Sequence, residues 1–191
     1  HLTDVMRALE DAGARLNLAK CKFFQDQTTF LGHVVTRQGV HTDPRLVAKI
    51  REHPRPTSKK DVRSFLGVVN YYRRFIQGCA QISAPLYDLT DNSHAPMQWT
   101  DECEQAFVAL KDKLATAPVL TIADENKPFV VHTDASAHAI GAVLSQRDDE
   151  GHMHPVAYHS RKLTDAQTRK STFERELLAI KDALEHWKDY L

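Results

Sequence analysis

Two acidic residues, Asp134 and Glu176, stand where carboxylates could do chemistry. Asp134 follows the apolar run 129–131, and Glu176 lies three residues after Phe173 in a stretch with helical periodicity. A helix packed across a strand would bring two such side chains together, and carboxylate oxygens are ligands that Mg²⁺ takes beside a phosphate. The pair therefore predicts part of a magnesium site. Two ordinary readings stay open: Asp134 could begin a turn, and Glu176 could be a surface residue of the helix.

A block of positive charge is the second candidate site. The chain holds 25 Lys+Arg and 25 Asp+Glu, but residues 41–76 hold nine basic and three acidic residues, a local net charge of +6. Such a block is typical of a surface that binds a polyanion, although a solvated helix face would carry the same charges. The candidate phosphate contacts are Lys59, Lys60, Arg63, Arg73 and Arg74.

Histidine and cysteine offer weaker metal hypotheses. His152 and His154 are two residues apart, but no third and fourth ligand follows at useful spacing, so they could equally be same-face residues of a strand. The three cysteines are an odd number without a C-x-x-C pattern. They argue against a disulfide framework or a zinc ribbon and favour a reducing, intracellular setting.

The elements that must position these residues change character along the chain. Residues 2–12 read as a helix and residues 16–41 as short strands, with a tight turn at 38–39. Residues 42–120 read as almost entirely helical. Helix starts are predicted at Asp43-Pro44, at the capping box from Ser58 to Asp61, and at Thr100.

After residue 120 the hydrophobic period falls from 3.6 to 2. Runs at 129–134, 139–146 and 153–160 predict a three-stranded antiparallel meander. Ser171 with Glu174 forms a capping box that opens a long helix. Its apolar residues recur at steps of three and four and are predicted to be its core face: Phe173, Leu177, Ile180, Leu184, Trp187 and Leu191.

Composition bounds the class of protein. With 191 residues, 42% hydrophobic and 26% charged, the chain suits one or two small globular domains. No apolar run approaches the roughly 20 residues of a membrane span, so no membrane partner is expected. The chain opens and stops inside amphipathic segments, so we expect it to be a piece of a longer polypeptide.

Short motifs along the chain occur in a specific order. They include LAKCKF at 18–23, FLGH at 30–33, FLG at 65–67, NYYRRFI at 70–76, APVL at 117–120, TDAS at 133–136 and ERELLAI at 174–180. This ordered set resembles the reverse transcriptase/ribonuclease H region of the Pol polyprotein of gypsy-type (Metaviridae-like) LTR retrotransposons, over essentially the whole chain.

The resemblance implies an α+β architecture in three parts. Residues 1–41 would be the C-terminal part of the polymerase palm, and Leu31, Gly32 and His33 would lie in the region that grips the primer end. Residues 42–120 would be the helical thumb and connection. Residues 121–191 would be a truncated ribonuclease H-like half-domain of three antiparallel strands and a long helix.

The resemblance also implies a chemistry. The intact parent copies RNA into DNA and hydrolyses the RNA strand of RNA–DNA hybrids with Mg²⁺ held by four carboxylates. Asp134 matches the first carboxylate and Glu176 the second; Glu176 is preferred to Glu174 because it directly precedes LLAI. The polymerase aspartate pair would fall before residue 1 and the other nuclease carboxylates after residue 191, so the chain is expected to be inactive alone. Gln167 and Lys170 depart from the family pattern, which has Glu and Tyr there.

Partners follow from the same resemblance. They would be an RNA–DNA hybrid or template–primer duplex and the remainder of the Pol polyprotein, in a reverse-transcription particle in the cytoplasm or nucleus. One alternative is a non-catalytic retroelement relic that binds nucleic acid or protein, with self-association through an open sheet edge. Another is a sugar kinase or actin-like ATPase, but residues 135–138 lack the glycine-rich phosphate turn that such enzymes need.

Overall fold

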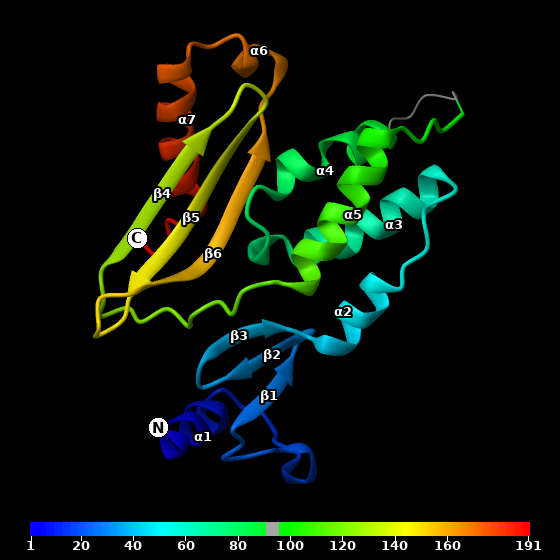
Figure 1. Cartoon of the computed structure of the whole chain (residues 1–191). Coiled ribbons are helices and arrows are strands. Elements are labelled where there is room, and N and C mark those ends of the chain that lie inside the picture. The colour runs from blue at the N-terminus through cyan, green and yellow to red at the C-terminus, as the bar shows by residue number, and fades with distance from the viewer. Residues whose placement is uncertain (91–95) are drawn as a thin grey trace.

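The computed structural model describes residues 1–90 and 96–191. Its N-terminal part is a small antiparallel sheet in the order β1-β2-β3, with a helix beside it (Figure 1). The elements are α1 (Leu2–Asp11), η1 (Leu18–Lys20), β1 (Gln27–Phe30), β2 (His33–Thr36) and β3 (Gly39–Thr42). A two-residue turn at Leu31-Gly32 joins β1 to β2, and both residues have positive φ, at 44° and 67°. This is the backbone sign that a tight type I′ hairpin requires.

A helical block follows, as the sequence predicts. It consists of α2 (Pro44–Arg51), α3 (Lys59–Tyr71), η2 (Arg73–Phe75), α4 (Cys79–Asp88) and α5 (Asp101–Ala115). The three predicted helix starts are confirmed: Asp43 accepts a bond from the Arg45 amide, Ser58 and Asp61 form a capping box, and Thr100 caps α5. Apolar residues of α3 and α5 form one core, which includes Val62, Phe65, Leu66, Val69, Phe107, Leu110 and Leu114.

The chain ends in the predicted three-stranded meander and long helix. Strands β4 (Phe129–Ala135), β5 (Ala139–Arg147) and β6 (Met153–Lys162) pair antiparallel in that order, followed by α6 (Asp165–Thr168) and α7 (Thr172–His186). Helix α7 packs on β4 and β5, whereas η2 and α4 pack against β6 (Figure 1). The α+β fold class inferred from the sequence is therefore confirmed.

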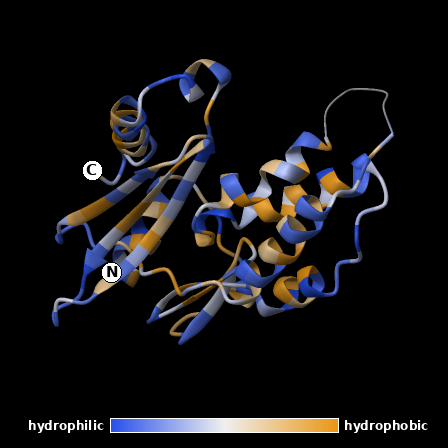
Figure 2. Ribbon diagram, turned by 45° about the horizontal axis from the view of Figure 1, so that its top comes forward, coloured by the Kyte–Doolittle hydropathy of each residue, from blue (hydrophilic) through white to orange (hydrophobic). Residues whose placement is uncertain are grey.

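Helix α7 packs with a different side from the one predicted. Five of the six residues of the expected core face are exposed, and we call four of them, Phe173, Leu177, Ile180 and Leu184, the apolar stripe. Phe173 is 72% exposed, and hydrophobic residues are visible on this helix near the C-terminus in Figure 2. Ala179, Ala183 and Trp187 are buried instead. The predicted core face was therefore wrong except for Trp187. The small side chains of Ala179 and Ala183 let the helix axis approach the sheet, and hydrogen bonds from β6 to Asp182 hold this side of the helix against it.

Several contacts join the C-terminal sheet to the helical block. An Arg73 guanidinium N–H donates to the Ser160 carbonyl at 2.6 Å, and one from Arg74 donates to the Val156 carbonyl at 3.2 Å. The Ala80 amide donates to Ser160 Oγ at 2.9 Å, so Ser160 is bound by both η2 and α4. These bonds fix the sheet on the block through β6. In the parts of the chain that the structure describes, every helix is too short or too polar to cross a membrane.

Candidate functional site

Asp134 lies near the end of β4, the strand whose outer edge pairs with no other described strand. Its neighbour Ala135 packs with Ile140 and Ala179 on the side of α7. Because side chains alternate along a strand, Asp134 is on the opposite face. There it is exposed and lines a cavity of about 160 Å³ that Gln77 and Gln81 line from the helical block.

Glu176 lies on α7 at the same end of the sheet. It is half-buried, one turn before Ala179, which contacts the end of β4 through Ala135. Asp182, on the opposite flank of the helix, contacts β6. Glu176 therefore lies on the flank toward β4. Asp134 and Glu176 thus lie at the same end of the sheet, beside the outer edge of β4. Asp134 lies on the face toward the helical block, and Glu176 lies on the face that α7 covers.

Both carboxylates are without protein partners. Neither Asp134 nor Glu176 accepts a hydrogen bond from, or forms an ion pair with, another described residue. Glu174 differs: it accepts bonds from the Ser171 amide and hydroxyl at 2.9 and 2.8 Å. These bonds, with Lys170 nearby, lower the Glu174 pKa. Glu174 is thus a helix cap, and Glu176 is the carboxylate left available to a ligand.

The donor set fits Mg²⁺ in chemistry, since both groups offer carboxylate oxygens. It falls short in number, because no group of three His, Cys, Asp or Glu residues within 1–90 and 96–191 could hold an ion. The residues present would supply part of a coordination shell.

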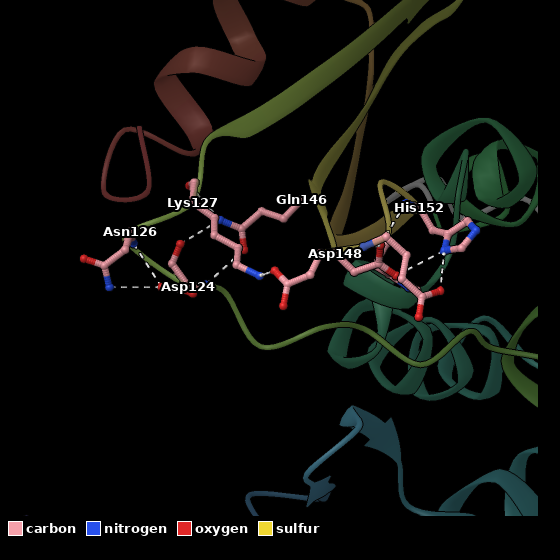
Figure 3. Close-up of polar contacts among 9 residues, drawn as sticks. Asp124, Asn126, Lys127, Gln146, Asp148 and His152 are labelled. Carbon is pink, nitrogen blue, oxygen red and sulfur yellow. Dashed lines mark hydrogen bonds and ion pairs between the residues drawn. The ribbon is translucent and has the colours of Figure 1, made fainter.

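His152 and His154 bind a carboxylate rather than forming a metal site. His154 Nε2 lies 2.8 Å from Asp148 Oδ2. His152 Nδ1 lies 3.4 Å from the same oxygen (Figure 3). The hydrogen bond from His154 is the main reason that the Asp148 pKa is well below its usual range. Beside this turn, Lys127 pairs with Asp149 at 2.6 Å. The cluster closes the β5–β6 hairpin, and His152 lies just outside β6.

The basic residues divide into two groups. Lys59 and Lys60 begin α3, and Arg63 is exposed one turn later, donating to the Thr90 carbonyl at 2.9 Å. Arg73 and Arg74 instead bind carbonyls of β6. The first group lies at one end of α3, and the second is used, at least in part, to hold the sheet against the block.

The turn from Leu31 to His33 is supported by two tyrosines of the NYYRRFI motif, a contact that the motif alone did not predict. The Tyr71 hydroxyl donates to the Leu31 carbonyl, and the Tyr72 hydroxyl donates to the Gly32 carbonyl at 2.7 Å. The His33 ring stacks on Tyr71 with centroids 5.4 Å apart. Burial, and then the nearby Arg74 charge, lower the His33 pKa. Leu31 itself stays exposed, so the turn presents it to solvent.

A polar cluster between β6 and α7 was also missed. His159 Nε2 lies 2.8 Å from Asp182 Oδ2, and Arg161 Nε donates to Asp182 Oδ1 at 2.9 Å. The cluster brings together residues 21 to 23 positions apart. No local motif could have indicated it, because Asp182 reads as an ordinary polar residue of a helix.

Comparisons with known proteins agree with this geometry. Residues 99–191 match the profile of the RNase H-like domain found in reverse transcriptase. The whole chain is 40% identical to 15% of the retrovirus-related Pol polyprotein from transposon 412 of Drosophila melanogaster. It is 38% identical to 14% of the transposon Tf2-3 polyprotein of Schizosaccharomyces pombe. The chain thus spans about a seventh of the length of these relatives.

Solved structures are similar over nearly the whole chain. The foamy viral protease-reverse transcriptase dRH in complex with double-stranded DNA superimposes with a TM-score of 0.82 and 27% identity, over 99% of this chain and 33% of that one. The same viral protein with an RNA/DNA hybrid gives a TM-score of 0.81 and 27% identity, over 99% and 26%. Residues 99–191 are thus similar to the RNase H-like domain found in reverse transcriptase, and the whole chain is similar to a segment of retrotransposon Pol polyproteins.

Proposed function

We propose that this chain is part of the reverse transcriptase/ribonuclease H of a gypsy-type LTR retrotransposon. The intact parent would copy RNA into DNA and hydrolyse the RNA strand of the hybrid, inside a reverse-transcription particle in the cytoplasm or nucleus. One observation carries the nuclease part of the proposal: Asp134 and Glu176 lie unpaired at one end of a sheet whose fold matches an RNase H-like domain. The similar viral enzyme has been solved with an RNA/DNA hybrid, which supports a hybrid as partner.

Asp134 and Glu176 would hold Mg²⁺ in the parent. When bound, the ion would polarise the scissile phosphate and position the attacking water. The chain's own contribution is to supply two negative oxygens at a sheet edge and to orient them with β4 and α7. Further carboxylates from the rest of the polyprotein would complete the shell.

The helical block and the Leu31 turn would bind the nucleic acid. Lys59, Lys60 and Arg63 would contact phosphates, which position a duplex without reading its sequence. Leu31, with Gly32 and His33 behind it, would contact the primer end. Arg73 and Arg74 would act near the duplex mainly by keeping the sheet in place.

Salt dependence tests the phosphate contacts. Fluorescence anisotropy with a labelled RNA–DNA hybrid should show affinity falling linearly with log salt. Replacing Lys59, Lys60 and Arg63 with Gln should reduce the slope by about 2 to 3, since each phosphate contact contributes about 0.7 to 0.9. The matched control replaces Lys113, Arg169 and Lys188, three exposed cations outside the basic segment 41–76, and should leave a steeper slope. Equal slopes for the two triple variants would refute this contact surface.

A second candidate function is protein binding by a non-catalytic relic. The exposed apolar stripe of α7 and the open edge of β4 favour it. Size-exclusion chromatography beside the hybrid titration separates the candidates. A discrete oligomer without hybrid affinity would favour the relic, and a monomer that binds hybrid would favour the nuclease segment.

A further inference from the structure

The cluster of His159, Arg161 and Asp182, which we call the clamp, holds α7 by one flank. Asp182 receives bonds from both β6 residues, at 2.8 and 2.9 Å. His186, one turn further along α7, stacks on His159 with centroids 3.8 Å apart. His159 and Asp182 are mostly buried, with side-chain exposures of 10% and 19%. The clamp is therefore a protected contact between helix and sheet.

The opposite flank of α7 carries a competing surface. At about 100° per residue, Asp182 and Glu176 lie roughly 120° apart around the helix, with Ala179 and Ala183 between them. The apolar stripe lies beyond Glu176 and is exposed. Burying apolar surface is favourable, so the exposed stripe would favour a rotation of α7 about its axis by about a quarter turn, which would place the stripe on the sheet.

We propose that Asp182, held by His159 and Arg161, is a positioning residue that opposes this roll and so keeps Glu176 at the outer edge of β4. A rolled helix would carry Glu176 from that edge toward the middle of the sheet, away from Asp134. The roll would also break two charge-assisted bonds and leave His159 and Arg161 on β6 without their carboxylate partner, which is costly for partly buried groups. The effect on metal binding rests on the function proposed above. The effect on the orientation of α7 is independent of that function.

Thiol labelling of the apolar stripe measures the rotation directly. Leu184→Cys, in a Cys21→Ser background, reports the exposure of the stripe, because Cys79 and Cys103 are buried. Adding Asp182→Asn should slow labelling by Ellman's reagent about fivefold, which corresponds to a rolled state populated about four to one. Asp182→Glu should restore much of the rate by returning a carboxylate.

The matched control is Glu185→Gln, which removes one acidic residue from the exposed side of the same helix, where it pairs with Lys181 at 3.4 Å. It should not slow labelling. If the clamp only stabilised α7, Asp182→Asn would loosen the helix and labelling would become faster instead of slower. Unchanged or faster labelling with Asp182→Asn would overturn the proposal. If that variant fails to fold by circular dichroism, His159→Gln breaks the clamp from β6 and decides in the same way.

Titration with Mn²⁺ tests the link to the metal site. Binding that Asp134→Asn removes should weaken at least several-fold in Asp182→Asn and stay unchanged in Glu185→Gln. If the unsubstituted chain of 191 residues shows no Mn²⁺ binding that depends on Asp134, these two carboxylates do not hold an ion without the further ligands proposed for the intact parent, and thiol labelling alone decides the clamp. If binding is present but indifferent to Asp182, the positioning role is wrong and the site stands.

Discussion

Leu31 occupies a left-handed backbone conformation, with φ at 44°, that leucine adopts rarely. The two tyrosine hydroxyl bonds to the turn hold it there. Such strain at an exposed side chain is typical of a residue placed for contact. The FLGH motif and the positive φ of Leu31 therefore both indicate that this turn has a role in binding.

Replacing Leu31 should separate stability from binding. Leu31→Asn should raise the free energy of unfolding by about 1 kcal/mol, because asparagine tolerates positive φ better. Thermal melting should rise by about 2 to 4 °C for a chain of this size. Hybrid affinity should fall, since the variant lacks the apolar side chain that we propose for the contact with the primer end. A variant that is both more stable and fully competent in binding would remove Leu31 from the proposed interface.

The pH dependence of stability should involve His186. Partial burial, together with the charges of His159 and Arg73, lowers its pKa in the folded protein. In the unfolded chain the pKa returns to about 6.5, so the unfolded state binds more protons as the pH falls below that value. The stabilisation is therefore complete above about pH 6.5 and is lost as the pH falls toward the lower folded pKa.

Thermal melts at pH 7.5 and 5.5 check this sign. The unsubstituted chain should melt at a lower temperature at pH 5.5 than at pH 7.5. The pKa of His33 is also lowered, so His33 contributes to the difference in the same direction. His186→Gln should reduce the difference, whereas replacing the exposed His138 should not. An identical difference in all three proteins would contradict the assignment to His186.

At the scale of elements, Gly39 joins the N-terminal sheet to the segment that leads into β4. The Val40 amide donates to the Leu120 carbonyl at 2.7 Å, and the Leu120 amide donates back at 2.9 Å. A Cβ on Gly39 would lie 2.3 Å from the Leu120 carbonyl oxygen, and φ is 142°. Only glycine allows this approach of two chain segments.

Gly39→Ala should therefore destabilise the protein by about 2 kcal/mol or more, through the clash and the positive φ together. Gly151→Ala is the matched control, because its φ is also positive but no atom lies within 4 Å of the added Cβ. Chemical denaturation should show a clearly larger loss for Gly39→Ala. Equal losses would mean that φ alone is responsible and that the close approach costs little.

Local patterns predicted the elements, because the capping residues Asp43, Ser58, Thr100 and Ser171 and the change of period act over a few residues. The orientation of α7 could not be predicted in that way. Its apolar stripe is the stronger local signal, yet bonds from His159 and Arg161 to Asp182 decide which side faces the sheet. Likewise, Arg73 and Arg74 read as phosphate contacts until β6, more than eighty residues later, supplies their carbonyl partners.

At the scale of the whole molecule, the carboxylates present determine the chemistry that the chain can do alone. Two unpaired carboxylates are fewer than a cage that positions both nucleophile and leaving group requires. Incubation with Mg²⁺ and a labelled RNA–DNA hybrid should therefore give no cleavage. A longer segment of the polyprotein should cleave, and Asp134→Asn should abolish that cleavage. Robust activity of residues 1–191 would refute this account of the site.

The double attachment of Ser160 to η2 and α4 has a consequence for the parent enzyme. The hairpin turn touches Tyr71 and Tyr72, the next residues Arg73 and Arg74 reach β6, and β6 belongs to the sheet that carries Asp134. In the proposed parent enzyme, this series of contacts would keep a fixed distance between the primer end and the site of hydrolysis. RNA would then be cut at a constant number of base pairs behind synthesis, and lengthening the chain between Phe75 and Cys79 should blur that spacing.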